Sequence, residues 1–159
     1  MKKSNVKVYV ISIAIALGVG ALAAFLTRGS MDIYSEIKTP PLSPPGFLFP
    51  IVWTVLYTLM GISAAIVYTS ENGTSTERNS ALKIYAESLA VNFLWSIVFF
   101  NFRAFLTAFA VIVLLLYLIL RTVSAYRKIE TTAAYLQIPY ALWVAFASYL
   151  NFAIWVLNR

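Results

Sequence analysis

The sequence contains no cysteine and no histidine among its 159 residues. Without cysteine the chain can form no disulfide, no thiolate nucleophile and no sulfur-ligated metal site. Without histidine it lacks the usual imidazole base, most kinds of zinc site and the usual proximal ligand of haem iron. These absences exclude a cysteine protease, a hydrolase with a Ser–His–Asp triad and a protein that holds haem through histidine.

Charged side chains are also scarce, since they make up 11% of the residues while hydrophobic residues make up 61%. A soluble domain of this length could not bury so much apolar surface, so we expect a membrane protein rather than an unusually hydrophobic soluble bundle. The net charge of +6 then reflects lysine and arginine in loops that face anionic headgroups. No basic stripe with interleaved aromatic residues lies outside the apolar runs, so nucleic-acid binding is not expected.

Five apolar runs are long enough to cross a bilayer, which takes about 20 largely apolar residues per helix. The sequence predicts an all-α integral membrane protein, with a single bundle of five transmembrane helices in one domain over residues 1–159. The first run follows lysines, as in a signal peptide, but it is long enough to span and no clear cleavage site follows it. We therefore expect it to be retained. The predicted helices cover residues 6–26, 46–68, 81–102, 104–123 and 133–157.

The distribution of lysine and arginine between the connections predicts the orientation in the membrane. The bias indicates that the amino terminus is cytoplasmic, and that the proline-rich loop and the carboxyl terminus lie outside. We expect the membrane to be a prokaryotic cell membrane. One side carries Lys2, Lys3, Lys7, Arg78, Lys83, Arg121, Arg127 and Lys128, and the other carries Arg28, Lys38, Arg103 and Arg159.

Residues 39–45, TPPLSPP, contain four of the six prolines in the chain. Each proline fixes its own φ and restricts the residue before it, so this segment cannot be helical. It must be stiff and extended up to the next helix, where Pro44 and Pro45 suit the first turn and Ser43 is a candidate cap. We expect it to form part of a lid over the bundle. The alternative is a connector that only sets the angle of the following helix.

Small residues recur every four positions in the first predicted helix, a spacing that lets two helix backbones approach closely. We predict that this face forms a homodimer, and the same spacing suits packing against another helix of the same chain. The residues concerned are Ala14, Gly18, Ala16, Gly20 and Ala24.

Glu87 is the charged residue that lies well inside a predicted span, and such residues are functional candidates. Lys83 lies four residues earlier on the same helix face, which favours an interfacial ion pair over a proton-coupled or ligand-binding carboxylate. A lone carboxylate is a poor catalytic set. No metal site is expected.

Aromatic and amide side chains gather on single faces of three predicted helices. Buried Asn and Trp need hydrogen-bond partners, so these groups can hold helices together. That reading and a ligand-binding role both stay open for Asn92 and Asn151. Trp53 and Trp143 favour a cavity for a flat apolar ligand, with an indole N–H left for its polar edge. The faces carry Phe49, Trp53 and Tyr57; Asn92, Ser96, Trp95 and Phe99; and Tyr140, Trp143, Ala147 and Asn151.

Three stretches resemble the TspO/translocator protein family, also called tryptophan-rich sensory proteins or peripheral-type benzodiazepine receptors. They are PPLSPPGFLFPIVWTVLYTLMG, LAVNFLWSIVFFNFR and IPYALWVAFASYLNFAIW, at residues 40–61, 89–103 and 138–155. The family pattern Pro-x-x-x-Pro-Pro, followed by Val-Trp-Thr-x-Leu-Tyr, is met from Pro40 to Tyr57. The Asn of the family's third helix matches Asn92, and its Pro-Tyr-x-x-Trp matches Pro139 to Trp143.

The resemblance implies five helices, usually a homodimer, and a ligand cavity covered by the first loop. Family members bind porphyrins such as protoporphyrin IX and haem, and synthetic isoquinoline carboxamides and benzodiazepines; sterol binding is associated with some. Trp53 and Trp143 would be the tryptophans tied to porphyrin binding. The expected ligand-binding residues are Tyr34, Pro44, Pro45, Trp53, Tyr57, Asn92, Trp95, Phe99, Phe100, Trp143 and Ala147.

Two departures from the family pattern concern ligands. Leu42 stands where an aromatic residue is usual and Thr39 where lysine is common, so we expect the lid to stack less well on a flat ligand. The sterol motif places a tyrosine shortly before a base, whereas this chain has Phe152 and Val156 at those positions. We therefore expect weak or no specific cholesterol binding.

Three functions follow as hypotheses. The first is a membrane receptor or carrier for porphyrins and similar planar ligands, used in tetrapyrrole sensing, transport or scavenging, with porphyrin as ligand and no required cofactor. The second is an enzyme that breaks down light-excited porphyrin through Trp53 or Trp143, since no acid–base pair supports other chemistry. The third is a scaffold that regulates a partner through the first helix. Transport proper has the least support, because the chain shows neither a charged pathway nor an internal repeat.

Overall fold

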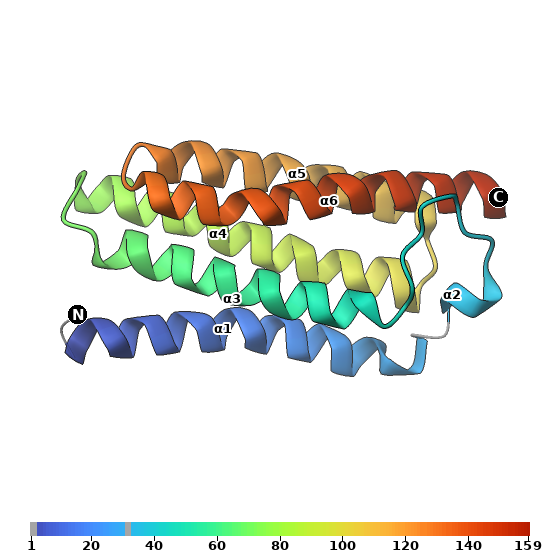
Figure 1. Cartoon of the computed structure of the whole chain (residues 1–159). Coiled ribbons are helices and arrows are strands. Elements are labelled where there is room, and N and C mark those ends of the chain that lie inside the picture. The colour runs from blue at the N-terminus through green and yellow to red at the C-terminus, as the bar shows by residue number, and fades with distance from the viewer. Residues whose placement is uncertain (1–2, 31–32) are drawn as a thin grey trace.

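The computed structural model describes residues 3–30 and 33–159, except for the side chains of Lys3, Ser4 and Tyr34. These residues form long helices that run side by side, with the two termini at opposite ends of the bundle (Figure 1). Within this described part, five helices are long and apolar enough to cross a membrane and no strand occurs. The predicted all-α bundle with five spans is confirmed.

The long helices coincide broadly with the apolar runs. They are α1 (Lys3–Thr27), α3 (Leu48–Thr69), α4 (Ser75–Ser96), α5 (Phe105–Arg127) and α6 (Thr131–Asn158). Two short helices, η1 (Arg28–Ser30) and α2 (Ile33–Glu36), lie in the connection between α1 and α3. A π-helical turn, η2 (Ile97–Asn101), continues α4. The carboxyl end of α4 and the loop before α3 lie at the same end of the bundle (Figure 1). We call this end the loop end.

The start of α4 corrects the prediction that residues 69–80 form a linker and that the third helix begins at residue 81. Thr69 still belongs to α3, and α4 begins at Ser75. Thr74 is the N-cap, and its Oγ1 accepts a hydrogen bond from the backbone N–H of Glu77 at 3.1 Å. A threonine followed by glutamate three residues later is a capping box. Because the first two turns of α4 are polar, a search for apolar runs misses them.

The proline-rich segment is non-helical, as predicted, and leads into α3. Ser43 does not cap that helix, because its hydroxyl donates instead to the carbonyl oxygen of Pro40 at 2.7 Å. The N-cap is Phe47, without a side-chain bond, so Pro44 and Pro45 precede the first turn rather than occupy it. Leu42 has a φ of 72°, a left-handed conformation that is unusual for a bulky residue and turns the chain sharply.

Helix α1 lies at the edge of the bundle and packs chiefly on α3 (Figure 1). Two glycines make this contact close. A Cβ atom at Gly20 would overlap the ring of Tyr57, and one at Gly61 would clash with the backbone of Ile13. The hydroxyl of Ser12 also donates to the carbonyl oxygen of Gly61 at 2.7 Å. One face of α1 is therefore locked to α3, while its other faces expose large apolar side chains.

The small residues of α1 divide between these faces. Ala16 is buried, whereas Gly20 faces α3 and Ala24 lines the cavity described below. Ala14 and Gly18 are exposed, and a Cβ atom at Gly18 would meet no atom within 4 Å. The spacing thus serves packing within the chain at Gly20. A homodimer through Ala14 and Gly18 stays a prediction, as does the orientation in the membrane.

Glu87 is exposed on α4, as is Lys83. Among the described side chains the only salt bridge joins Arg103 to Glu36, so the predicted Lys83–Glu87 pair is not formed. Glu87 is also absent from the lining of the cavity, and no ligand-binding role follows for it there.

Candidate ligand cavity

A cavity of about 340 Å³ lies in the half of the bundle nearer the loop end. This volume falls within the range of sites for small ligands. The lining carries no charged side chain and is dominated by aromatic and small residues. These residues are Gly20, Ala23, Ala24, Thr27, Gly46, Phe49, Pro50, Trp53, Tyr57, Trp95, Ser96, Phe99, Phe100, Trp143, Ala147, Leu150 and Asn151.

Two tryptophans from different helices, Trp53 of α3 and Trp143 of α6, meet at this cavity. Trp53 lies with its ring centroid 5.6 Å from that of Tyr57 and 6.3 Å from that of Tyr140. Trp143 makes an edge-to-face contact with Phe49, at a centroid distance of 5.8 Å and an interplanar angle of 67°. Such contacts hold large rings in fixed orientations, so these rings form one continuous aromatic wall.

The indole nitrogens at the cavity differ in their hydrogen bonding. Nε1 of Trp95 donates to Oδ1 of Asn151 at 2.9 Å, and Nδ2 of Asn151 donates to the carbonyl oxygen of Phe105 at 2.8 Å. Trp95 therefore ties α4 to α6. Nε1 of Trp143 is buried and has no hydrogen-bond partner among the described residues. Since buried N–H groups are almost always bonded, Trp143 carries an unsatisfied donor within the wall of the cavity.

The π-helical turn η2 shapes the opposite wall. Its widened ladder shows in the bond from the N–H of Phe102 to the carbonyl oxygen of Ile97, at 3.2 Å. Phe99 and Phe100 project from this turn into the cavity lining, with ring centroids 5.0 Å apart. Turns of this kind are rare and often occur at functional sites. Nothing in the apolar run of residues 97–100 signals the turn, so the sequence analysis missed it.

Asn92 lies behind the cavity and does not line it. Its Nδ2 donates to the hydroxyl oxygen of Tyr140 at 3.0 Å, and both residues are buried. Between the two readings left open for the amides, the structure shows helix-to-helix bonds for both Asn92 and Asn151. Only Asn151 also reaches the cavity.

The remaining predicted residues are placed as follows. Pro44 and Pro45 do not line the cavity, but the adjacent Gly46 does. The side chain of Tyr34 lies outside the described residues. The lining also includes residues that the prediction did not name as ligand-binding: Gly20, Ala23, Ala24, Thr27, Gly46, Phe49, Pro50, Ser96, Leu150 and Asn151. Phe49, Ser96 and Asn151 lie on the aromatic and amide faces that the sequence predicted, although they were not among the expected ligand-binding residues. Ala23 precedes Thr27 by four positions, so the two share a face of α1.

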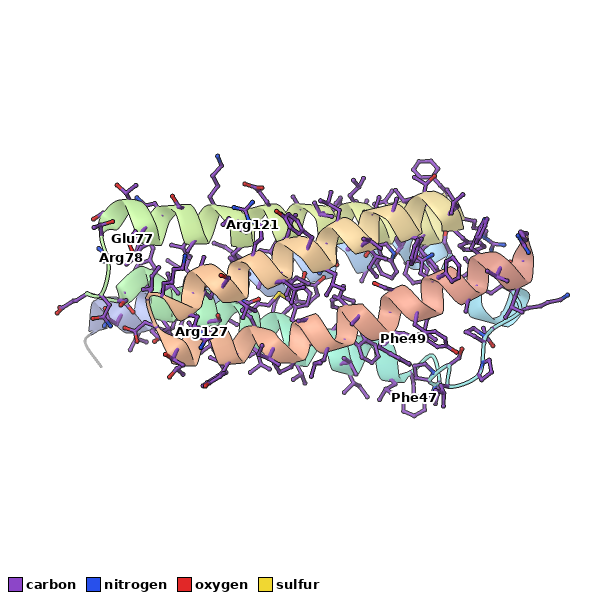
Figure 2. All side chains as sticks on the ribbon, turned by 90° about the horizontal axis from the view of Figure 1, so that it is seen from above. Phe47, Phe49, Glu77, Arg78, Arg121 and Arg127 are labelled. Atoms are coloured by element: carbon purple, nitrogen blue, oxygen red, sulfur yellow. The ribbon has the colours of Figure 1, made fainter. Side chains whose placement is uncertain are left out.

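The loop before α3 crosses the loop end of the bundle (Figure 1), and its Gly46 lines the cavity. Toward α6, the hydroxyl of Tyr149 donates to the carbonyl oxygen of Pro41 at 2.9 Å. Asn158 bonds both backbone groups of Lys38, at 3.0 Å and 2.9 Å. In Figure 2, Phe47 projects away from the bundle while Phe49 lies beside α6. The segment is thus fastened across the bundle and does more than set the angle of α3.

A second set of bonds fastens the loop to the end of α4. Nδ2 of Asn101 donates to the carbonyl oxygen of Leu26 at 3.1 Å, and the hydroxyl of Ser30 donates to Oδ1 of Asn101 at 2.9 Å. Arg103 pairs with Glu36 at 2.6 Å. Because Asn101 belongs to the same π turn as Phe99 and Phe100, the cavity wall and the loop share one structural element.

Residues 12–156 match the TspO/MBR family. The chain is 37% identical to the tryptophan-rich protein TspO of Chlorobaculum tepidum over 147 residues, and this stretch covers 92% of each chain. It is 36% identical over 142 residues to the tryptophan-rich sensory protein of Cereibacter sphaeroides, covering 87% of each chain. It is 33% identical over 141 residues to the translocator protein of Bos taurus, covering 88% of this chain and 83% of the relative.

Proposed function

The chain belongs to the TspO/MBR family of membrane proteins, and on that premise we propose that it binds porphyrins and similar planar, apolar molecules in the cavity between Trp53 and Trp143. The observation that carries the proposal is the meeting of these indoles, from α3 and α6, at one cavity without charged lining residues. A flat ring system would stack on the aromatic wall.

The lining also indicates how a porphyrin would lie. Because no lysine or arginine faces the cavity, the propionate groups belong at the loop end rather than inside. Lys38 is exposed in that region, and Arg103, paired there with Glu36, would have to exchange that carboxylate for a propionate. The ring would enter with its apolar edge first, and the fastened loop would have to yield to admit it. This arrangement suits a receptor or carrier in tetrapyrrole sensing or scavenging.

The direct test is a titration of the purified protein with protoporphyrin IX, followed by the absorbance of the porphyrin so that loss of tryptophan does not alter the signal. We expect the Trp53→Phe/Trp143→Phe variant to bind at least ten-fold more weakly than the wild type. Trp155→Phe is the matched control, because Trp155 lies in α6 but does not line the cavity. Equal affinity of the double variant and the control would refute the proposal.

A second candidate activity is light-driven breakdown of the bound porphyrin. Both indoles line the cavity, so either lies where it can exchange an electron with an excited ring. Illuminated complexes of Trp53→Phe and Trp143→Phe, at saturating porphyrin, test this directly. Product formation at the wild-type rate in both variants would remove the named residues from the reaction while leaving the binding proposal intact.

A further inference from the structure

A second hollow lies in the other half of the bundle, away from the loop end. It has a volume of about 400 Å³ and is bounded by α1, α3 and α4. We call it the α1–α4 groove. It shares no residue with the first cavity. Its lining is Val8, Ile11, Ser12, Ile15, Ala64, Ala65, Tyr68, Leu82, Tyr85, Ala86 and Leu89.

The groove exists because α1 packs closely on α3 but makes much less contact with α4. Alanines at 64, 65 and 86 leave space that larger side chains would fill. Ile11 and Ile15 on its rim are about half exposed, at 47% and 55%. In an integral membrane protein this rim faces lipid, so an acyl chain is the molecule at hand to fill an apolar groove of this kind.

One polar atom in the groove lining lacks a partner. Tyr85 is only 7% exposed, and its hydroxyl is buried without a hydrogen-bond partner among the described residues. Buried hydroxyl groups are nearly always bonded. Because that hydroxyl is buried and the ring lies 6.5 Å from the ring of Tyr126 in the core, Tyr85 presents its apolar ring, and not a donor, to the groove.

Two lysines lie close to the groove on the helices that form it. Lys7 precedes Ile11 by one turn on the same face of α1, and Lys83 follows Leu82 in α4. Both side chains are exposed, and neither takes part in a salt bridge among the described residues. Glu87 lies one turn farther along α4, beyond Lys83. Exposed lysines near a membrane surface attract anionic headgroups.

Arg78 is committed elsewhere. Its guanidinium donates to the carbonyl oxygens of Asn72 and Gly73, at 2.8 Å each, and Figure 2 shows it beside Glu77 at the end of α4. It therefore braces the linker, which leaves Lys7 and Lys83 as the cations near the groove among the described side chains.

The depth of these groups agrees with the dimensions of a bilayer. The span from Ser75 to Asn101 has 27 residues, about 40 Å of helix, whereas the hydrocarbon core is about 30 Å thick. The first turns of α4 therefore extend into the headgroup region, and Lys83 lies within snorkelling distance of it.

We propose that the α1–α4 groove binds an anionic phospholipid from the leaflet at the amino-terminal end of the bundle. One acyl chain fills the groove, and the phosphate lies between Lys7 and Lys83. The proposal is independent of what the first cavity binds.

The test uses the full-length protein reconstituted with equal amounts of phosphatidylglycerol and phosphatidylcholine, then released for native mass spectrometry. The wild type should retain phosphatidylglycerol in preference. Lys7→Gln/Lys83→Gln should lower that preference at least five-fold, since one lysine near the surface contributes roughly that factor. Arg127→Gln/Lys128→Gln is the matched control, because it removes the same charge at the same end of the bundle outside the groove.

A second variant tests the groove itself. Ala86→Leu should abolish retention of the lipid, whereas Ala110→Leu, an exposed position on α5, should not. An equal loss of the preference for phosphatidylglycerol in Lys7→Gln/Lys83→Gln and in Arg127→Gln/Lys128→Gln would overturn the proposal. Full retention of the lipid by Ala86→Leu would overturn it as well. The other occupant to consider is a second copy of the chain. If the wild type carries no lipid and forms a dimer that Ala86→Leu dissociates, the proposal is wrong.

Discussion

Arg103 and Glu36 form a salt bridge, with the guanidinium Nη2 2.6 Å from the carboxylate Oε2. The pair joins the turn between α4 and α5 to the end of the short helix α2, across the loop end of the bundle. Arg103 adopts a φ of 51°, a left-handed conformation that is uncommon for residues other than glycine. Since both side chains are about half exposed, the pair adds less than about 1 kcal/mol to stability. Its position points instead to control of the loop.

The first prediction follows from that position. Glu36→Gln removes the ion pair while other bonds still fasten the loop, so the loop should open more often. We expect association and dissociation of protoporphyrin IX to become several-fold faster in stopped-flow measurements, with little change in melting temperature. Glu71→Gln, an exposed carboxylate in the linker after α3, is the control. Unchanged rates in Glu36→Gln would show that the pair does not restrain access.

The second prediction concerns the amide that holds Trp95. Asn151→Leu removes the acceptor for the indole N–H of Trp95 and the donor to the carbonyl oxygen of Phe105, and leaves the buried indole N–H unpaired. We expect the free energy of unfolding to fall by about 1–2 kcal/mol. Ser148→Ala is the comparison, since that hydroxyl bonds only within its own helix, to Val144. Denaturation in detergent, followed by circular dichroism, measures both; equal stability of the two variants would contradict the role assigned to Asn151.

The helices and the aromatic faces could be predicted because each depends on local sequence. Lipid selects apolar runs of a fixed length, and a spacing of four residues places Phe49, Trp53 and Tyr57 on one side of a helix. That these faces meet those of α4 and α6 depends on packing, and here the similarity to a known family supplied the expectation. The loop was predicted to be stiff because proline restricts the backbone whatever surrounds it.

Other features could not be read from the apolar pattern. The π turn lies inside a continuous apolar run, and its Asn101 is held by the carbonyl oxygen of Leu26, which is distant in sequence. The indole N–H of Trp95 has a partner in Asn151 of α6, whereas that of Trp143 has none among the described residues. This difference depends on how the helices pack, which the apolar pattern does not give. The early start of α4 was detectable, but only from the polar pair Thr74 and Glu77.

The third prediction uses two glycines of α1 as a matched pair. A Cβ atom at Gly20 would overlap the Tyr57 ring, which also lines the cavity, whereas one at Gly18 would meet open space. Gly20→Ala should therefore lower the free energy of unfolding by about 1–3 kcal/mol, as overpacking does, and weaken porphyrin binding. Gly18→Ala should leave binding unchanged and slightly stabilise the helix. Thermal melts and the porphyrin titration check both. Similar behaviour of the two variants would mean that the close contact between α1 and α3 is absent in the membrane.

The fourth prediction tests the exposed small-residue face as a homodimer contact. Ala14 and Gly18 have no packing role within the chain, because both are exposed. If this face is the contact, Gly18→Leu should convert dimers to monomers while the melting temperature and porphyrin affinity stay within error of the wild type. Cross-linking in native membranes and light scattering in detergent measure the oligomer. Gly29→Leu, at an equally open glycine in η1, is the control. A dimer that survives Gly18→Leu must be formed by another surface.

The last prediction concerns iron. The cavity lining includes no methionine, and the chain has no histidine or cysteine, so a porphyrin bound there would gain little from its metal. Stacking on Trp53 and Trp143 is the same for a metal-free ring. We therefore expect protoporphyrin IX to bind at least as tightly as haem, with dissociation constants measured side by side by absorbance titration. Zinc protoporphyrin, which is flat and redox-inert, should bind like the other two. A preference for haem of ten-fold or more would require an iron ligand, and Tyr57, whose hydroxyl is the one phenol in the lining, would then be the residue to change to phenylalanine.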